Sequence, residues 1–119
     1  MTRPIYKNIY VAATNQHIGK TTSTLGLVAA FINRGLNVGY CKPVGQQSLS
    51  FHDLVVDKDT ILFADLIRFP IRPEIHSPVI LGSGATTSFL DNPAGFNFSD
   101  KIKFAQNVLQ QEHELTIYE

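Results

Sequence analysis

The sequence has little of several things, and each shortage excludes a class of protein. Its 119 residues include one cysteine, Cys41, so no disulfide can form within the chain and a reducing, cytoplasmic setting is expected. Ten basic and ten acidic side chains give zero formal net charge, which shows no electrostatic footprint for nucleic acid or an anionic membrane. No apolar run approaches the roughly 20 residues of a membrane helix, and no secretory signal is visible.

What is present is typical of one globular domain. The chain is 44% hydrophobic and 17% charged, a balance that separates it from disordered sequences. Its length is near the most common size of a domain and is sufficient for one buried core. No repeat, low-complexity segment or linker divides it, so we expect a single domain over residues 1–119.

The stretch Ile9–Thr22, IYVAATNQHIGKTT, organises the chain. An apolar β-branched run, a polar loop, Gly-Lys-Thr and a helical pattern follow one another, which is typical of a phosphate-binding loop. Backbone N–H groups of such a loop and of the first helical turn converge on one point, and the helix dipole favours negative charge there. Lys20 suits the β- and γ-phosphates of a nucleotide, and the Thr21 hydroxyl suits Mg²⁺.

The usual spacing of this motif is not met, because Thr14 stands where its first glycine belongs. A loop that is one residue longer fits, and an ordinary strand-to-helix turn is the alternative interpretation. Gly19 would let the backbone approach a phosphate closely, whereas His17 is expected to line the site without chemistry. The predicted nucleotide-binding residues are Thr14, Asn15, Gln16, His17, Ile18, Gly19, Lys20, Thr21 and Thr22.

The rest of the chain alternates between strand and helix patterns. Short strands are expected over Lys7–Ala13, Asn37–Val44, Pro78–Leu81 and Leu115–Tyr118, and helices over Lys20–Arg34, Asp57–Ile67 and from Ser99 or Asp100 to about Glu112. A loop is expected over Gly45–Val56, irregular chain over Phe69–Ser77, a turn or a second oxyanion loop over Gly82–Thr87, and one helical turn over Thr86–Leu90. This alternation predicts an α/β fold with a mainly parallel sheet flanked by helices.

Within these helices the spacing of apolar residues predicts the buried faces. The first helix should bury Leu25, Val28 and Ile32, with Leu27 and Phe31 widening the stripe, and Gly35 should end it in a left-handed conformation. The second should bury Ile61, Leu62 and Leu66 and be capped by Asp59 or Thr60, and the last should bury Ile102, Ala105, Val108 and Leu109. The first strand reads as covered on both faces, and Cys41 as a buried strand residue.

A second motif, Tyr40-Cys41-Lys42-Pro43-Val44-Gly45-Gln46, follows at the end of the next strand. The two motifs together resemble the dethiobiotin synthetase family, and both also occur in the dethiobiotin-synthetase-like domain at the N-terminus of some phosphotransacetylases. The resemblance is clear over Ile5–Gln47, weak in the middle, and returns at the last strand. It implies a P-loop NTPase-like fold that binds ATP and Mg²⁺.

The resemblance also implies an activity and roles for individual residues. The synthetases are ATP-dependent cyclo-ligases that close a cyclic urea on a diamine, through a carbamate that ATP phosphorylates. Lys20 and Lys42 would be the catalytic residues, and Thr21, Asp59 and Glu119 would contact the metal. Purely structural interpretations stay open: Lys42 could be a solvated lysine, and Asp57 and Asp59 could be helix caps.

The sequence departs from this family in two respects. It stops at Glu119, where the family has glycines, so we expect an incomplete version of the fold, either a truncated product or a remnant. The continuation Gly45-Gln46-Gln47 leans toward the phosphotransacetylase type. The alternatives to an active ligase are therefore a non-catalytic nucleotide-sensing module and an inactive fragment. A nucleotide, a small-molecule substrate and a second copy of the chain are the expected partners.

Overall fold

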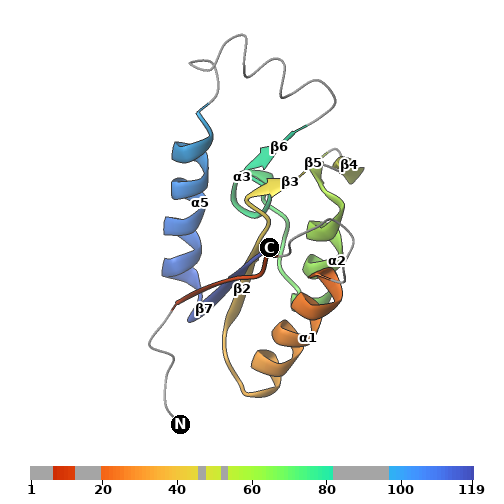
Figure 1. The fold of residues 1–119 in the computed structure, drawn as a ribbon, viewed down its shortest axis with the longest axis vertical. Coiled ribbons are helices and arrows are strands. Elements are labelled where there is room, and N and C mark those ends of the chain that lie inside the picture. The colour runs from red at the N-terminus through yellow and green to blue at the C-terminus, as the bar shows by residue number, and fades with distance from the viewer. Residues whose placement is uncertain (1–6, 13–19, 46–47, 52–53, 82–96) are drawn as a thin grey trace.

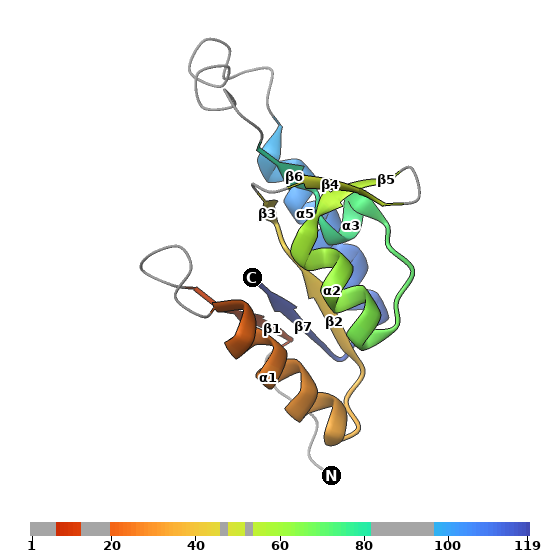
Figure 2. The ribbon, with the colours of Figure 1, turned by 90° about the vertical axis from the view of Figure 1, so that its right-hand side faces the viewer.

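The computed structural model describes residues 7–12, 20–45, 48–51, 54–81 and 97–119, with side chains not described for 48–51. These residues form three layers (Figures 1 and 2). Helices α1 (Lys20–Asn33) and α2 (Lys58–Ile67) cover one face of a small sheet, and α5 (Phe98–Glu112) covers the other. The predicted α/β architecture is confirmed.

The central sheet is parallel and has the strand order β1–β7–β2. Its strands are β1 (Asn8–Tyr10), β2 (Val38–Cys41) and β7 (Leu115–Tyr118). The strand predicted last in the sequence therefore lies between the first two, with Ile117 opposite both Ile9 and Tyr40. All three strands run in one direction, so their carboxyl ends share one edge of the sheet.

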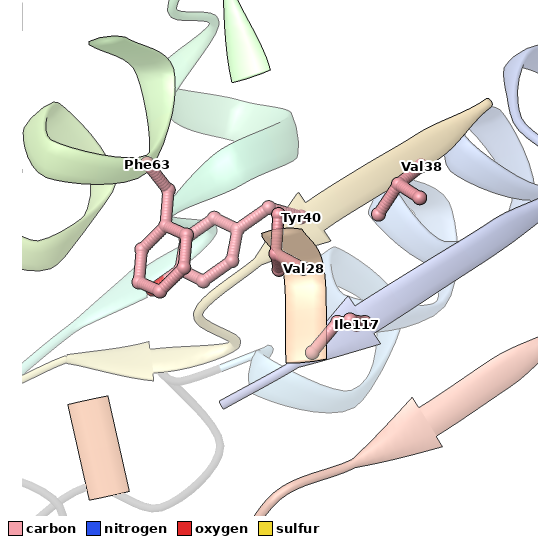
Figure 3. Close-up of a cluster of buried hydrophobic side chains, with 5 residues drawn as sticks. All are labelled: Val28, Val38, Tyr40, Phe63 and Ile117. Atoms are coloured by element: carbon pink, nitrogen blue, oxygen red, sulfur yellow. The ribbon is translucent and has the colours of Figure 1, made fainter. Parts of the chain in front are cut away.

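On one face of the sheet, a hydrophobic cluster packs strands β2 and β7 against helices α1 and α2. Alternation along β2 places Val38 and Tyr40 on this face. Tyr40 stacks on Phe63 of α2, with ring centroids 4.1 Å apart and planes at 11° (Figure 3). The fully buried members of this cluster are Val28, Val38, Tyr40, Phe63 and Ile117. This packing fixes α2 against β2.

The opposite face carries a second buried cluster. Cys41 and Tyr118 point to this side and pack against Ile75 and Leu109. Ile75 belongs to a short helix, α3 (Pro73–His76), in a segment that was expected to be irregular. That expectation was wrong, because a proline at the first helical position lacks only an N–H group that would have no partner within the helix.

Two smaller sheets lie beyond the central one. Strand β3 (Val44–Gly45) pairs in parallel with β6 (Val79–Ile80), which confirms the strand predicted near residue 80. Strands β4 (Ser48–Phe51) and β5 (Leu54–Asp57) form an antiparallel pair where a loop was predicted over 45–56. That prediction gave weight to Gly, Gln and Ser and overlooked the alternation in Ser48–Phe51 and the β-branched residues of β5.

Helix α1 buries part of the predicted face, because Val28 is buried and Leu25 and Phe31 pack against the core. It ends one residue early, and Gly35 has the expected left-handed conformation (φ 80°). Thr24 and Val28 are its buried residues, whereas Leu27 and Ile32 are each 37% exposed. A threonine can occupy the core side because its hydroxyl donates to the Lys20 carbonyl oxygen at 2.8 Å.

Helix α2 is capped by Asp57, one of the two aspartates that the sequence analysis kept open as helix caps. The Asp57 side chain accepts a hydrogen bond from the Asp59 backbone N–H at 2.9 Å, so neither Asp59 nor Thr60 is the cap. Thr60 is buried, with its hydroxyl 2.6 Å from that of Ser77. Leu62 and Leu66 are exposed, and the face toward the sheet is carried by Phe63.

The remaining predictions concern the ends of the sheet and the last helix. Tyr10 is 62% exposed, so β1 is not covered on both faces. In α5, Ala105 and Leu109 are buried as predicted, but Asn97 precedes the helix and neither Ser99 nor Asp100 caps it. Residues 82–90, with the predicted turn, oxyanion loop and helical turn, lie outside the described residues. No helix in the described part of the chain is both long and apolar enough to span a membrane.

His113 lies close to Gly39 of β2, whereas Gly26 in α1 has open space around it. Substitution by alanine should therefore change the free energy of unfolding in opposite directions at these two glycines. A Cβ on Gly39 would lie 2.5 Å from His113 Cδ2, and that ring is hydrogen-bonded to Asn37 Oδ1 at 2.8 Å. Gly39→Ala should therefore lower the free energy of unfolding by about 1–3 kcal/mol. Gly26→Ala in α1 meets nothing within 4 Å and should raise it by up to about 1 kcal/mol.

Urea unfolding of the two variants beside the wild-type protein measures both effects. The same sign of change at Gly39 and Gly26 would contradict the packing described here.

Candidate functional site

Four predicted site residues meet at the carboxyl edge of the central sheet. Lys42 directly follows β2 and Glu119 directly follows β7, while Thr21 and Asp59 lie in the first turns of α1 and α2. In Figure 2 the end of the chain lies beside the start of α1. In open α/β sheets this edge is where ligands bind.

The Lys42 ammonium group is at the centre of this cluster. Its Nζ lies 2.7 Å from Asp59 Oδ2, 3.3 Å from Asp57 Oδ1 and 4.0 Å from Glu119 Oε1. The side chain is only 16% exposed, so the interpretation of Lys42 as a solvated lysine is wrong. Its backbone N–H donates to the His76 carbonyl oxygen at 2.9 Å, which anchors the main chain at the end of β2.

The pairing of Lys42 with Asp59 stabilises the charged form of both groups. Burial by itself lowers the pKa of Lys42, but the hydrogen bond that Lys42 donates to Asp59 and the attraction of Asp57 and Asp59 outweigh it and raise the pKa. Burial by itself raises the pKa of Asp59, but hydrogen bonds involving Lys42 and Glu119 and the Lys42 charge lower it overall. Both groups are therefore ionised at neutral pH.

The Glu119 side chain is as enclosed as that of Asp57. It is 0% exposed, and the Glu119 backbone N–H donates to the Cys41 carbonyl oxygen at 3.0 Å. Tyr40 donates its hydroxyl to Oε1 at 3.2 Å, whereas Oε2 is buried without a hydrogen-bond partner among the described residues. Burial, and then the hydrogen bond with Asp59 and its negative charge, raise the pKa of the Glu119 carboxyl.

Three acidic side chains thus share one ammonium group in a largely buried place. The Thr21 hydroxyl completes the group, at 3.4 Å from Asp59 Oδ2. Within the described residues no three or more His, Cys, Asp or Glu side chains are grouped as a metal site. The oxygens gathered at this edge of the sheet come from the carboxyl groups of Asp57, Asp59 and Glu119 and from the Thr21 hydroxyl.

Two members of the cluster were missed by sequence reasoning as site residues. Asp57 caps α2 and also faces Lys42, so for this residue the capping interpretation is correct and incomplete. A Cβ on Gly45 would lie 2.8 Å from Asp57 Cβ, which explains why glycine follows Val44 here. Tyr40 lies on β2, two residues before Lys42, and the period of two along an extended chain places both side chains on one face.

The other predicted site residues are less informative. Residues 14–19 of the phosphate-binding loop, including His17, lie outside the described residues. Lys20 begins α1, where its carbonyl oxygen accepts from Thr24, and Thr22 is exposed. Cys41 is buried as predicted, and burial raises the pKa of its thiol to about 12, so it is unreactive at neutral pH.

Comparison with known proteins supports the predicted family. A family model described as an AAA domain matches residues 7–117, nearly the whole chain. The chain belongs to this AAA domain family. Its P-loop NTPase-like fold class, predicted from the sequence, is thereby confirmed.

Individual relatives of this AAA domain carry the name that the sequence resemblance suggested. The chain is 29% identical over 80 residues to the ATP-dependent dethiobiotin synthetase BioD of Clostridium kluyveri, covering 67% of this chain and 33% of the relative. It is 26% identical over 116 residues to the protein of the same name from Caldicellulosiruptor saccharolyticus, covering 95% of this chain and 47% of the relative. The chain therefore spans less than half the length of these relatives.

His76, whose carbonyl oxygen holds the backbone of Lys42, should make the stability of the protein depend on pH. His76 is 2% exposed, accepts a hydrogen bond at Nδ1 from the Arg72 backbone N–H at 3.0 Å and stacks on Phe69. Burial, reinforced by the Arg72 charge, lowers its pKa to about 4. Between about pH 6.5 and pH 4 the unfolded chain binds a proton at this residue and the folded chain does not. Stability should therefore fall as the pH falls through this window, by up to about 1.4 kcal/mol per unit.

Urea unfolding at pH 7 and pH 5 measures this slope. His76→Asn keeps an acceptor for the Arg72 N–H and cannot be protonated, so its stability should depend less on pH than that of the wild-type protein. An identical slope in the two proteins would contradict the assignment to His76.

Proposed function

We propose that this chain binds a nucleoside triphosphate, ATP, together with Mg²⁺ at the carboxyl edge of its sheet. The observation that carries the proposal is the convergence of Thr21, Asp59 and Glu119 around Lys42. The position beside the start of α1 adds backbone N–H groups and the positive end of a helix dipole, which favour phosphate.

The residues present fit a magnesium ion. Mg²⁺ prefers oxygen ligands, and proteins usually hold it through one or two carboxylates plus the phosphates of a substrate. Glu119 offers a buried oxygen without a partner among the described residues, and Asp59 and Thr21 offer further oxygens beside it. When bound, the ion would neutralise charge on the phosphates and on the acidic side chains together.

Two lysines would complete the binding of phosphate. Lys20, in the Gly-Lys-Thr motif, supplies an ammonium group to the β- and γ-phosphates. Lys42 now neutralises Asp57 and Asp59, which are 3.3 and 2.7 Å away. Once a cation balances these acidic groups, the Lys42 ammonium is available to phosphate or carbamate oxygens. The electrostatic balance of the site thus links metal binding to the role of Lys42.

Two finer functions share this nucleotide site. The first is the ATP-dependent ring closure of a diamine, the reaction of the synthetases that the chain resembles. The second is a non-catalytic domain that senses nucleotide, which the continuation Gly45-Gln46-Gln47 favours because it is nearer to the phosphotransacetylase type. Only the ligase needs a pocket for a diamine, so the substrate distinguishes the two.

Binding is tested by titration calorimetry with Mg-ATP. Lys20→Ala should weaken binding about tenfold or more, because it removes a charge-assisted hydrogen bond to phosphate. Lys103→Ala is the matched control, since Lys103 is an exposed lysine on α5, across the sheet from α1. Equal affinities of the wild-type and Lys20→Ala proteins would overturn the proposal.

Catalysis is tested by the release of ADP. If the chain is a ligase, 7,8-diaminononanoate with bicarbonate should increase ADP release above the level with ATP alone, and Lys42→Ala should remove the increase. Intact ATP binding without any increase would favour the nucleotide-sensing domain over the ligase.

A further inference from the structure

We propose that Tyr40 is the positioning residue that holds Glu119 and Asp59 in place for a divalent cation. This inference rests on the proposed function and adds a residue to it that makes no contact with nucleotide or metal itself. Tyr40 lies on β2 and is fully buried; its hydroxyl contacts Glu119, and its ring contacts Phe63 on the helix that carries Asp59.

The first part is the hydroxyl group. It donates to Glu119 Oε1 at 3.2 Å, while Lys42 Nζ is 4.0 Å from the same oxygen. Burial, and next the negative charge of Glu119, raise the pKa of the Tyr40 phenol far above its usual range, so the hydroxyl keeps the proton that it donates to Glu119. The hydrogen bond engages one carboxyl oxygen and leaves Oε2 buried without a partner among the described residues, as a ligand oxygen would be.

The second part is the ring. It stacks on Phe63 at 4.1 Å with nearly parallel planes, as Figure 3 shows. Phe63 lies four residues after Asp59 on α2, so the two side chains share one side of that helix. The stack therefore sets the distance of the Asp59 turn from β2.

Strand β2 thus fixes Glu119 at two points. The Cys41 carbonyl oxygen accepts from the Glu119 backbone N–H, and the Tyr40 hydroxyl orients the side chain. Residues that orient metal ligands from behind typically change metal affinity by 10–100-fold when they are removed. The contribution of Tyr40 is therefore large enough to measure.

The experiment compares ATP affinity with Mg²⁺ and with EDTA in wild-type protein and in Tyr40→Phe. Phenylalanine keeps the stacked ring and removes only the hydroxyl. The tightening of ATP binding by Mg²⁺ should be about tenfold smaller in Tyr40→Phe, while the affinity in EDTA should be unchanged. Tyr118→Phe is the matched control, because the Tyr118 hydroxyl is buried without a hydrogen-bond partner among the described residues.

A double-mutant cycle separates positioning from a general loss of structure. If Tyr40 acts through Glu119, Tyr40→Phe should cause no further loss of the Mg²⁺ effect in a Glu119→Gln background. Phe63→Leu, which keeps the hydroxyl and removes the stack, should also reduce the Mg²⁺ effect. It provides a second test if Tyr40→Phe proves unstable in urea unfolding.

The outcomes are distinguishable. A full Mg²⁺ effect in Tyr40→Phe, or equal losses in the two backgrounds, would overturn the role of Tyr40 and leave the proposed function standing. Wild-type protein that binds ATP without any Mg²⁺ effect would overturn the metal site and the role of Tyr40 together. Wild-type protein that does not bind ATP would overturn the proposed function itself.

Discussion

The arrangement at the carboxyl edge of the sheet depends on one ammonium group. Asp57, Asp59 and Glu119 come from two distant segments, and the Lys42 Nζ lies within 4.0 Å of an oxygen of each. Acidic groups this close in a mostly buried place repel one another unless a cation lies among them. Removing the ammonium would leave uncompensated acidic groups, which costs more than an ion pair of this kind contributes. Lys42 is therefore a structural requirement before any ligand is considered.

Strand β2 connects this charged cluster to the apolar core. Successive residues alternate between its faces, so Tyr40 and Lys42 point toward α1 and α2 while Cys41 points toward α3 and α5. This short strand and the residue after it thus supply the aromatic stack, a carbonyl acceptor for Glu119 and the central cation. Packing defects along β2 would be transmitted to the site, because Tyr40 belongs to the core and also donates to Glu119.

The sequence was sufficient for the residues whose position follows from topology. Lys42 and Glu119 end parallel strands, and Thr21 and Asp59 begin helices, so a parallel α/β sheet brings them to one edge whatever its details. The spacing of apolar residues did not predict which helical residues are buried where a hydrogen-bond partner lets a polar side chain enter the core. Leu27 and Leu62 fit a helical stripe, yet the core accepts Thr24 and Thr60, because each hydroxyl has a hydrogen-bond partner. Tyr40 was missed because its partner Glu119 lies 79 residues away, and no local pattern contains that distance.

The place of β7 between β1 and β2 has a consequence for how the chain folds. The first two strands are 28 residues apart from Tyr10 to Val38, yet neither pairs with the other in the described structure. Each of them pairs only with β7 in the described structure, and β7 is synthesised more than 70 residues after β2. Pairings this distant in sequence slow folding, and the open strand edges are exposed to other chains meanwhile. The gap between β1 and β2 in the nascent sheet therefore stays open until β7 has been synthesised.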